Sequence, residues 1–303
     1  MEAIRTDDLV KVYHSKQTVE ALKNMSLSIN RGELFTLIGQ NGAGKTTFLR
    51  IISTQLLPTK GQAHVLEYDV VKQPKEVRKH IAIVPQDVAT YGNFTPWEYC
   101  YYFSKLRGMS KHDAEEASCG ALKSVELWDM RNRPCATLSG GEKKRAIIAS
   151  ALSADADIFM LDEPTSGLDA VARRNVWTVL REMVRCGKTV VLTTHIMEEA
   201  EMVSDRLMII HKGLMVAQGT PDQIRQRISD KYRIIVEGDL GDLELTQSHN
   251  HTVTFGNRHI VYVRDEGEAL QLVEKALRKG LKAEAARVTL EDAFVRLVGG
   301  ELD

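Results

Sequence analysis

A glycine-rich loop is the feature of this chain that most directly suggests chemistry. It reads Gly39-Gln40-Asn41-Gly42-Ala43-Gly44-Lys45-Thr46-Thr47 and matches the phosphate-binding pattern G-x-x-x-x-G-K-[ST]. In such a loop the glycines let backbone N–H groups surround phosphate oxygens, the lysine reaches the β- and γ-phosphates, and the following hydroxyl binds Mg²⁺. Lys45 and Thr46 stand in those two positions. The loop therefore predicts a site for ATP or a similar nucleotide with Mg²⁺.

Two adjacent carboxylates form a second candidate group. Asp162 and Glu163 follow the apolar run Ile158–Leu161, which predicts a buried strand with both acids at its carboxyl end. Ligands of open α/β sheets bind at that edge, so we expect Asp162 to join the Mg²⁺ shell. A solvated loop is the alternative, and the apolar run before the acids argues against it.

A third segment, Ser139-Gly140-Gly141-Glu142, has the S-x-x-E spacing of a capping box that opens a helix. An ordinary well-capped helix is one interpretation. The two glycines favour another, because glycine weakens a helix and is usually kept where something approaches closely. A helix N-terminus with exposed N–H groups and a serine hydroxyl can serve as a second anion site.

These three segments together resemble the ATP-binding subunits of ATP-binding-cassette (ABC) systems. The resemblance implies that Ser139 to Glu142 contact the γ-phosphate held by a second protomer, so that two ATP molecules lie in a head-to-tail dimer. It also implies that Glu163 is the catalytic base and that Asp169, which ends the segment Ser166–Asp169, links the two sites across the dimer. Glu142 stands where glutamine is commonest in the family, a variation that occurs widely.

The same resemblance assigns three more site residues. His195 follows the apolar run Thr189–Thr194 and matches the family's switch histidine, which positions the γ-phosphate and the attacking water. Gln86 follows another apolar run and matches the glutamine that senses Mg²⁺ and water. Tyr13 matches the aromatic residue that stacks on adenine. A core aromatic on an alternating strand is the alternative for Tyr13.

The composition limits the classes of function. Lys and Arg number 40 and Asp and Glu number 41, so the net charge is close to zero. No overall electrostatic attraction therefore favours binding to nucleic acid or to an anionic membrane. The four cysteines lack metal-binding spacing and are expected to be reduced thiols. We expect no signal peptide, and no apolar run approaches the ~20 residues of a membrane span. A soluble chain is therefore expected. The resemblance to ABC systems implies that it lies at the cytoplasmic face of the membrane, with other polypeptides crossing the bilayer.

The order of the patterns predicts an α/β fold with a parallel core sheet and an N-terminal antiparallel β subdomain. The resemblance implies that this core is a P-loop NTPase with a RecA-like sheet. Residues 87–150 read as an inserted helical subdomain. Its aromatic cluster either fills a core or lines a groove for a helix of a membrane subunit; the cluster is Trp97, Tyr99, Tyr101, Tyr102 and Phe103. We expect residues 1–228 to form the nucleotide-binding domain and residues 229–303 a small α+β accessory domain.

The segment Leu290–Leu297 resembles the ending of daunorubicin-resistance-type (ABC-2) exporter ATPases. We therefore expect a Mg²⁺-dependent ATPase that pairs with a second copy of itself or a homologous subunit. Integral membrane permease subunits, in trans, would move the substrate, and no nucleic acid is expected as a partner. A soluble cluster-assembly ATPase is the alternative. A catalytically idle binding module is a further alternative. The presence of all the expected catalytic and phosphate-binding residues argues against it: Lys45, Asp162, Glu163 and His195.

Overall fold

The computed structural model describes residues 1–14, 18–86, 92–238 and 252–299. The chain divides into two compact units, Met1–Gln218 and Gly219–Asp303. The boundary suggested by the sequence, residue 228, lies after helix α8 (Pro221–Gln226), and the functional division into two domains there stays a prediction. Residues 87–91, at the start of the predicted helical subdomain, lie outside the described residues.

A six-stranded sheet forms the centre of the first unit, in the order β10-β9-β3-β8-β7-β6. All pairings from β9 to β6 are parallel. The three strands β3, β7 and β8 are buried along their whole length, as parallel strands covered on both faces are. The six strands are β3 (Leu34–Ile38), β6 (Ile81–Val84), β7 (Ile158–Asp162), β8 (Thr189–Thr194), β9 (Arg206–His211) and β10 (Leu214–Gly219).

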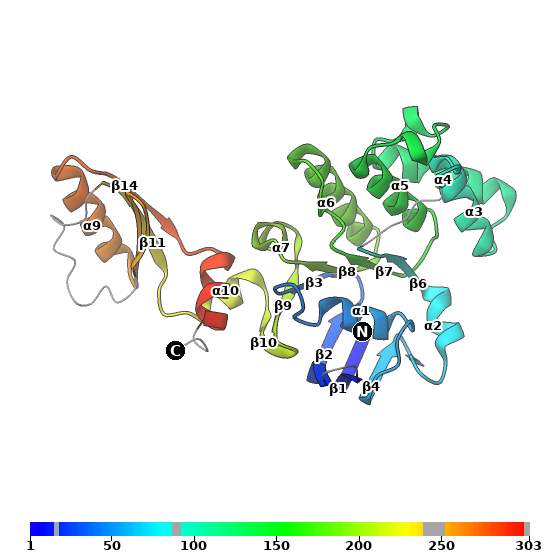
Figure 1. Ribbon diagram of the computed structural model, residues 1–303, viewed down its shortest axis with the longest axis horizontal. Coiled ribbons are helices and arrows are strands. Elements are labelled where there is room, and N and C mark those ends of the chain that lie inside the picture. The colour runs from blue at the N-terminus through cyan, green and yellow to red at the C-terminus, as the bar shows by residue number, and fades with distance from the viewer. Residues whose placement is uncertain (15–17, 87–91, 239–251, 300–303) are drawn as a thin grey trace. The chain divides into compact units, whose positions relative to one another are not determined.

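Alternate residues of the central strands pack into two different cores. Phe35 and Met160 join a core that includes α1 (Lys45–Ile52). Phe159 points the other way, into a core that includes α6 (Ala170–Arg185). Figure 1 accordingly shows α1 and α6 on opposite faces of the central sheet. Because successive side chains of a strand alternate between faces, the continuous apolar runs of the sequence supply both cores.

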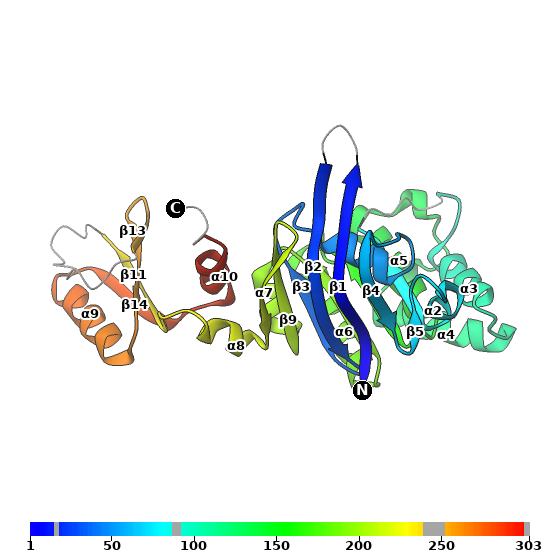
Figure 2. The ribbon, with the colours of Figure 1, turned by 90° about the horizontal axis from the view of Figure 1, so that it is seen from below.

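A second, four-stranded sheet has the order β2-β1-β4-β5. Its central strand β1 pairs antiparallel with both β2 and β4, and Figure 2 shows β1 and β2 running side by side as long ribbons. This sheet confirms the predicted antiparallel β subdomain. Its strands are β1 (Glu2–His14), β2 (Thr18–Asn30), β4 (Lys60–Val65) and β5 (Tyr68–Asp69), and the short helix α2 (Pro74–His80) follows them.

Helices gather beside one end of the central sheet (Figure 1). They are α3 (Pro96–Leu106), α4 (Lys111–Ser124) and α5 (Gly140–Leu152), with short 3₁₀ turns at Trp128–Met130 and Cys135–Thr137. The aromatic residues of α3 differ in their burial, and the groove for a membrane subunit stays a prediction. Trp97 and Tyr99 pack against the helical core, whereas Tyr102 and Phe103 are exposed.

The second unit contains an antiparallel sheet in the order β12-β13-β11-β14. Helix α9 (Glu266–Arg278) covers it, with Ala269 and Leu272 packed against Ile234 and Val261. This is the expected α+β arrangement, except that β14 was not predicted. The strands are β11 (Tyr232–Glu237), β12 (Thr252–Phe255), β13 (Arg258–Val263) and β14 (Lys282–Arg287), and α10 (Leu290–Gly299) ends the unit.

None of the helices in the described part of the chain combines the length and the apolar character that crossing a membrane requires.

Candidate functional site

The predicted phosphate loop, Gly39–Thr47, connects β3 to α1. Gly44 caps α1 with a φ of 115°, and a Cβ on it would overlap the backbone oxygen of Ala21, so only glycine fits there. The loop lines a cavity of about 200 Å³. Its other lining residues are Ala21, which the sequence did not single out, and the predicted Gln86 and Glu163.

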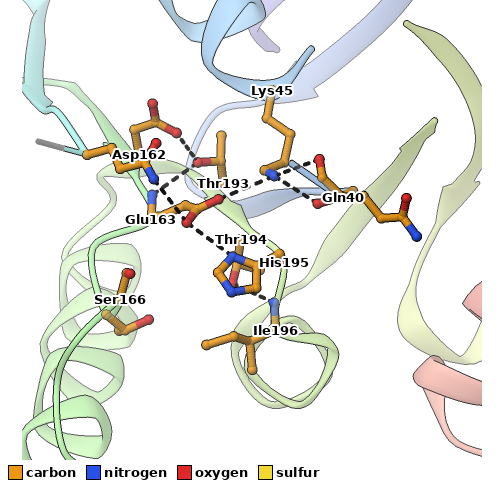
Figure 3. A network of polar contacts seen from close by, with 12 residues as sticks. Gln40, Lys45, Asp162, Glu163, Ser166, Thr193, Thr194, His195 and Ile196 are labelled. Atoms are coloured by element: carbon orange, nitrogen blue, oxygen red, sulfur yellow. Dashed lines mark hydrogen bonds and ion pairs between the residues drawn. The ribbon is translucent and has the colours of Figure 1, made fainter. Parts of the chain in front are cut away.

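Lys45 lines this cavity, and its side chain is only 5% exposed. Its ammonium donates to the carbonyl oxygens of Gly39 at 2.8 Å and of Gln40 at 3.3 Å. It also lies 3.3 Å from Oε1 of Glu163 (Figure 3). A buried ammonium needs such oxygen partners, and phosphate oxygens supply the same kind. The loop and its lysine therefore fit the triphosphate of a nucleotide.

The Glu163 carboxylate lies between three of the predicted site residues. One oxygen faces Lys45, while the other lies 3.1 Å from Nδ1 of His195 and accepts a 3.4 Å hydrogen bond from the Gln86 amide. Glu163 is buried and has a φ of 47°. A non-glycine residue held in this left-handed region is uncommon, and such residues cluster at functional sites.

Thr193, a residue that the sequence did not single out, fixes both acids. Its hydroxyl donates to Asp162 Oδ1 and accepts from the backbone N–H of Glu163 at 3.1 Å (Figure 3). The pairing of β7 with β8 places Asp162 opposite Thr193 and makes these contacts possible. The neighbouring strand thus orients Asp162 and Glu163 together.

Thr46, Asp162 and Gln86 offer a hydroxyl, a carboxylate and an amide oxygen. Thr46 and Gln86 line the phosphate cavity, and Asp162 directly precedes Glu163, which also lines it. Hard oxygen donors of this kind are what Mg²⁺ takes, usually together with substrate phosphates and waters. The three residues therefore fit a Mg²⁺ that is bound along with the nucleotide.

The segment Ser139–Glu142 forms the predicted capping box at the start of α5. Glu142 accepts from the Ser139 backbone N–H at 2.7 Å, and the Ser139 hydroxyl accepts from the N–H of Glu142 at 3.3 Å. The first of these bonds is the main cause that lowers the pKa of Glu142. Among the described residues that line the phosphate cavity, none comes from this segment. The structure therefore keeps this capping box apart from the phosphate cavity of its own chain.

The segment from Glu163 to Asp169 is held against α5. Lys144 donates to the backbone oxygens of Glu163 at 2.5 Å and Ser166 at 3.3 Å. A Cβ on Gly141 would come within 3.3 Å of Leu168, which explains a small residue there. Asp169 caps α6 by accepting from two backbone N–H groups at 2.9 Å, and these bonds lower its pKa.

Tyr13 lies near the end of β1 with 36% of its surface exposed. Its hydroxyl is 3.4 Å from the Thr47 hydroxyl, next to the phosphate loop. The Lys11 ammonium is 5.3 Å from the centre of its ring. This exposure disfavours the core-packing alternative, and stacking on adenine stays a prediction.

The fold and the site define the class of protein as a P-loop ATPase. The family model described as ABC transporter matches residues 22–166. The chain is 37% identical to the Nod factor export ATP-binding protein I of Rhizobium etli, over 100% of this chain and 95% of that protein. It is 33% identical to the doxorubicin resistance ATP-binding protein DrrA of Mycobacterium tuberculosis, over 97% and 92% of the two chains.

A solved dimeric ATP-binding cassette, bound to ADP and phosphate in a post-hydrolysis state, has a similar fold. Its TM-score is 0.67 at 27% identity, covering 72% of this chain and 98% of that one. The chain therefore belongs to the ABC transporter family, among its ATP-binding proteins. The predicted fold class and ATPase activity are confirmed, and these relatives do not favour the alternative of a non-transport ATPase.

Proposed function

We propose that this chain is the ATP-hydrolysing subunit of an ABC-2-type exporter, which encloses two Mg²⁺·ATP in a head-to-tail dimer and drives separate membrane subunits. The observation that carries the proposal is the contact of Lys45, Gln86 and His195 with the single carboxylate of Glu163 at the carboxyl edge of the core sheet. The names of the relatives, which state Nod factor export and doxorubicin resistance, support export as the direction.

The Lys45–Glu163 ion pair suggests how binding prepares hydrolysis. A γ-phosphate that takes up the Lys45 ammonium competes with Glu163 for it, because both are anions. Glu163 is then available to accept the proton of the attacking water, while His195 positions the phosphate. Bound Mg²⁺, held by Thr46, Asp162 and Gln86, would neutralise phosphate charge. Ser139 to Glu142 and Asp169 are proposed to complete the site of the opposite protomer.

The exposed aromatic residues of α3 and the turn before it offer a surface for a membrane subunit at the cytoplasmic face. Phe94, Tyr102 and Phe103 are 39%, 48% and 37% exposed, and the ring centres of Phe94 and Tyr102 lie 5.9 Å apart. Exposed aromatic patches commonly mark interaction sites. We propose that an apolar helix of the permease packs here.

The test is ATP turnover by the wild-type chain and two variants. Glu163→Gln should bind ATP normally but lower the turnover by about 100-fold, since general-base catalysis is worth at least that much. It should also trap an ATP-dependent dimer visible by gel filtration. Lys45→Ala should instead abolish tight ATP binding. Near wild-type turnover by Glu163→Gln would show that Glu163 is not the base.

A further inference from the structure

Glu199 is a carboxylate buried inside the ATPase unit. It lies on α7 (Met197–Val203) and is 0% exposed. Its Oε1 accepts hydrogen bonds from the hydroxyl of Thr165 at 2.7 Å and from the indole N–H of Trp177 at 2.8 Å. Its Oε2 has no hydrogen-bond partner within the described ranges. Burying a carboxylate is costly even when it is partly bonded, so simple core packing does not explain a glutamate here.

The two donors connect this carboxylate to the segment Thr165–Asp169 and to the helix that follows it. Thr165 follows the Asp162–Glu163 pair closely along the chain. Trp177 belongs to α6, the helix that Asp169 caps. Glu199 therefore holds the start of the segment Thr165–Asp169 directly and its end through α6.

The same residue is joined to the histidine of the site. Helix α7 begins directly after His195 and Ile196, and the Ile196 N–H donates to the Thr194 hydroxyl at 3.0 Å. The position of α7 therefore depends on the end of strand β8, after which His195 contacts Glu163. One buried carboxylate connects the three segments that carry Glu163, Asp169 and His195.

We propose that Glu199 is a positioning residue of the ATPase. It holds the segments that carry Glu163 and Asp169 in a fixed position relative to His195. The inference rests on the proposed function, because its readout is the hydrolysis of ATP. Glu199 does not touch the phosphate cavity, so its loss should lower the catalytic rate constant rather than weaken the binding of ATP.

The first experiment compares Glu199→Gln and Glu199→Leu by steady-state kinetics. Glu199→Gln keeps one acceptor oxygen for Thr165 and Trp177, so its kcat should stay within about twofold of wild type. Glu199→Leu removes both bonds, and its kcat should fall by about tenfold with the KM for ATP changed less than about twofold. As a control, Val203→Ala removes packing at the buried end of α7 and should leave kcat unchanged per folded molecule.

A second variant separates positioning from stability. In Thr165→Val/Trp177→Phe/Glu199→Leu all the paired polar groups are replaced together, so no donor is left buried without a partner. We expect this triple variant to fold and melt close to wild type and still to show the roughly tenfold loss of kcat. A folded triple variant or Glu199→Leu with wild-type kcat would overturn the inference. Wild-type protein without any ATPase activity would instead contradict the proposed function.

Discussion

Among single residues, Lys144 of helix α5 donates hydrogen bonds to the backbone oxygens of Glu163, the proposed catalytic base, and of Ser166. We expect Lys144→Met to lower kcat by about tenfold, because hydrogen bonds to charged groups are worth about 1.5–3 kcal/mol and the backbone of Glu163 would lose one. The affinity for ATP should change little. Lys143→Met, at the neighbouring position, is the matched control, and an equal loss in both variants would contradict a specific role of Lys144.

The contribution of Glu142 to the stability of the folded chain depends on pH. Its pKa is lowered in the folded chain, chiefly by the Ser139 N–H, so the ionised form is favoured by folding. The stabilisation is present above the unfolded pKa of about 4.3 and is lost as the pH falls through the lower folded value. Urea unfolding of wild type and Glu142→Gln should therefore differ at pH 7 and converge in acid. A difference that stays constant with pH would disprove this origin.

Among the elements, α10 is attached to its sheet by Asp292. This buried carboxylate accepts from Tyr262 at 2.7 Å and from Arg233 at 3.3 Å, and it caps its own helix through Thr289. Burial is the main cause that raises the pKa of Tyr262, and the bond to Asp292 follows. Because these partners lose their shared acceptor, Asp292→Ala should destabilise the second unit by about 3 kcal/mol.

Chemical denaturation followed by hydrogen exchange of α10 measures this effect. Glu291→Ala is the control, since Glu291 is an exposed acid in the same helical turn. Unchanged protection of α10 in Asp292→Ala would show that the apolar contacts of Ala293 and Phe294 suffice to hold the helix.

The exposed aromatic side chains of α3 should matter for partners and not for hydrolysis. Tyr102→Ser/Phe103→Ser removes apolar side chains that are exposed, so folding and basal ATP turnover should be unchanged. Co-purification with the membrane subunits should be lost. Leu277→Ser, at a more exposed apolar position on α9, should retain it. Retention by both variants would place the docking surface elsewhere.

At the scale of the molecule, the described buried residues that form the two cores of the ATPase belong to the first unit, from Ala3 to Ile210. A chain truncated after Thr220 should therefore fold and bind ATP through Lys45 and Thr46. We further propose that the second unit helps to hold the dimer together when ATP is absent. The turnover of the truncated chain should then depend more steeply on protein concentration, because its dimerisation would rest on nucleotide alone. Sedimentation with and without ATP measures this, and equal dimer affinities would remove that role.

The sequence predicted β8 and the phosphate loop well, because both signals are local. Nine consecutive residues specify the loop, and an unbroken apolar run specifies a strand buried on both faces. The strand β14 was missed for the opposite reason. Lys282–Arg287 consists of Lys, Ala, Glu and Arg, which favour helices, and it is a strand because it pairs with β11.

The sequence by itself determined the nucleotide chemistry of this protein: a lysine and a threonine at the start of a helix, and two acids at the end of a strand. Only the tertiary structure decided which distant residues orient the acids and the segment that follows them. Thr193, Lys144 and Glu199 lie 31, 19 and 34 positions from the partners that they orient, Asp162, Glu163 and Thr165. Hydrogen bonds across such separations carry no periodicity along the chain, because they exist only once strands and helices have packed together.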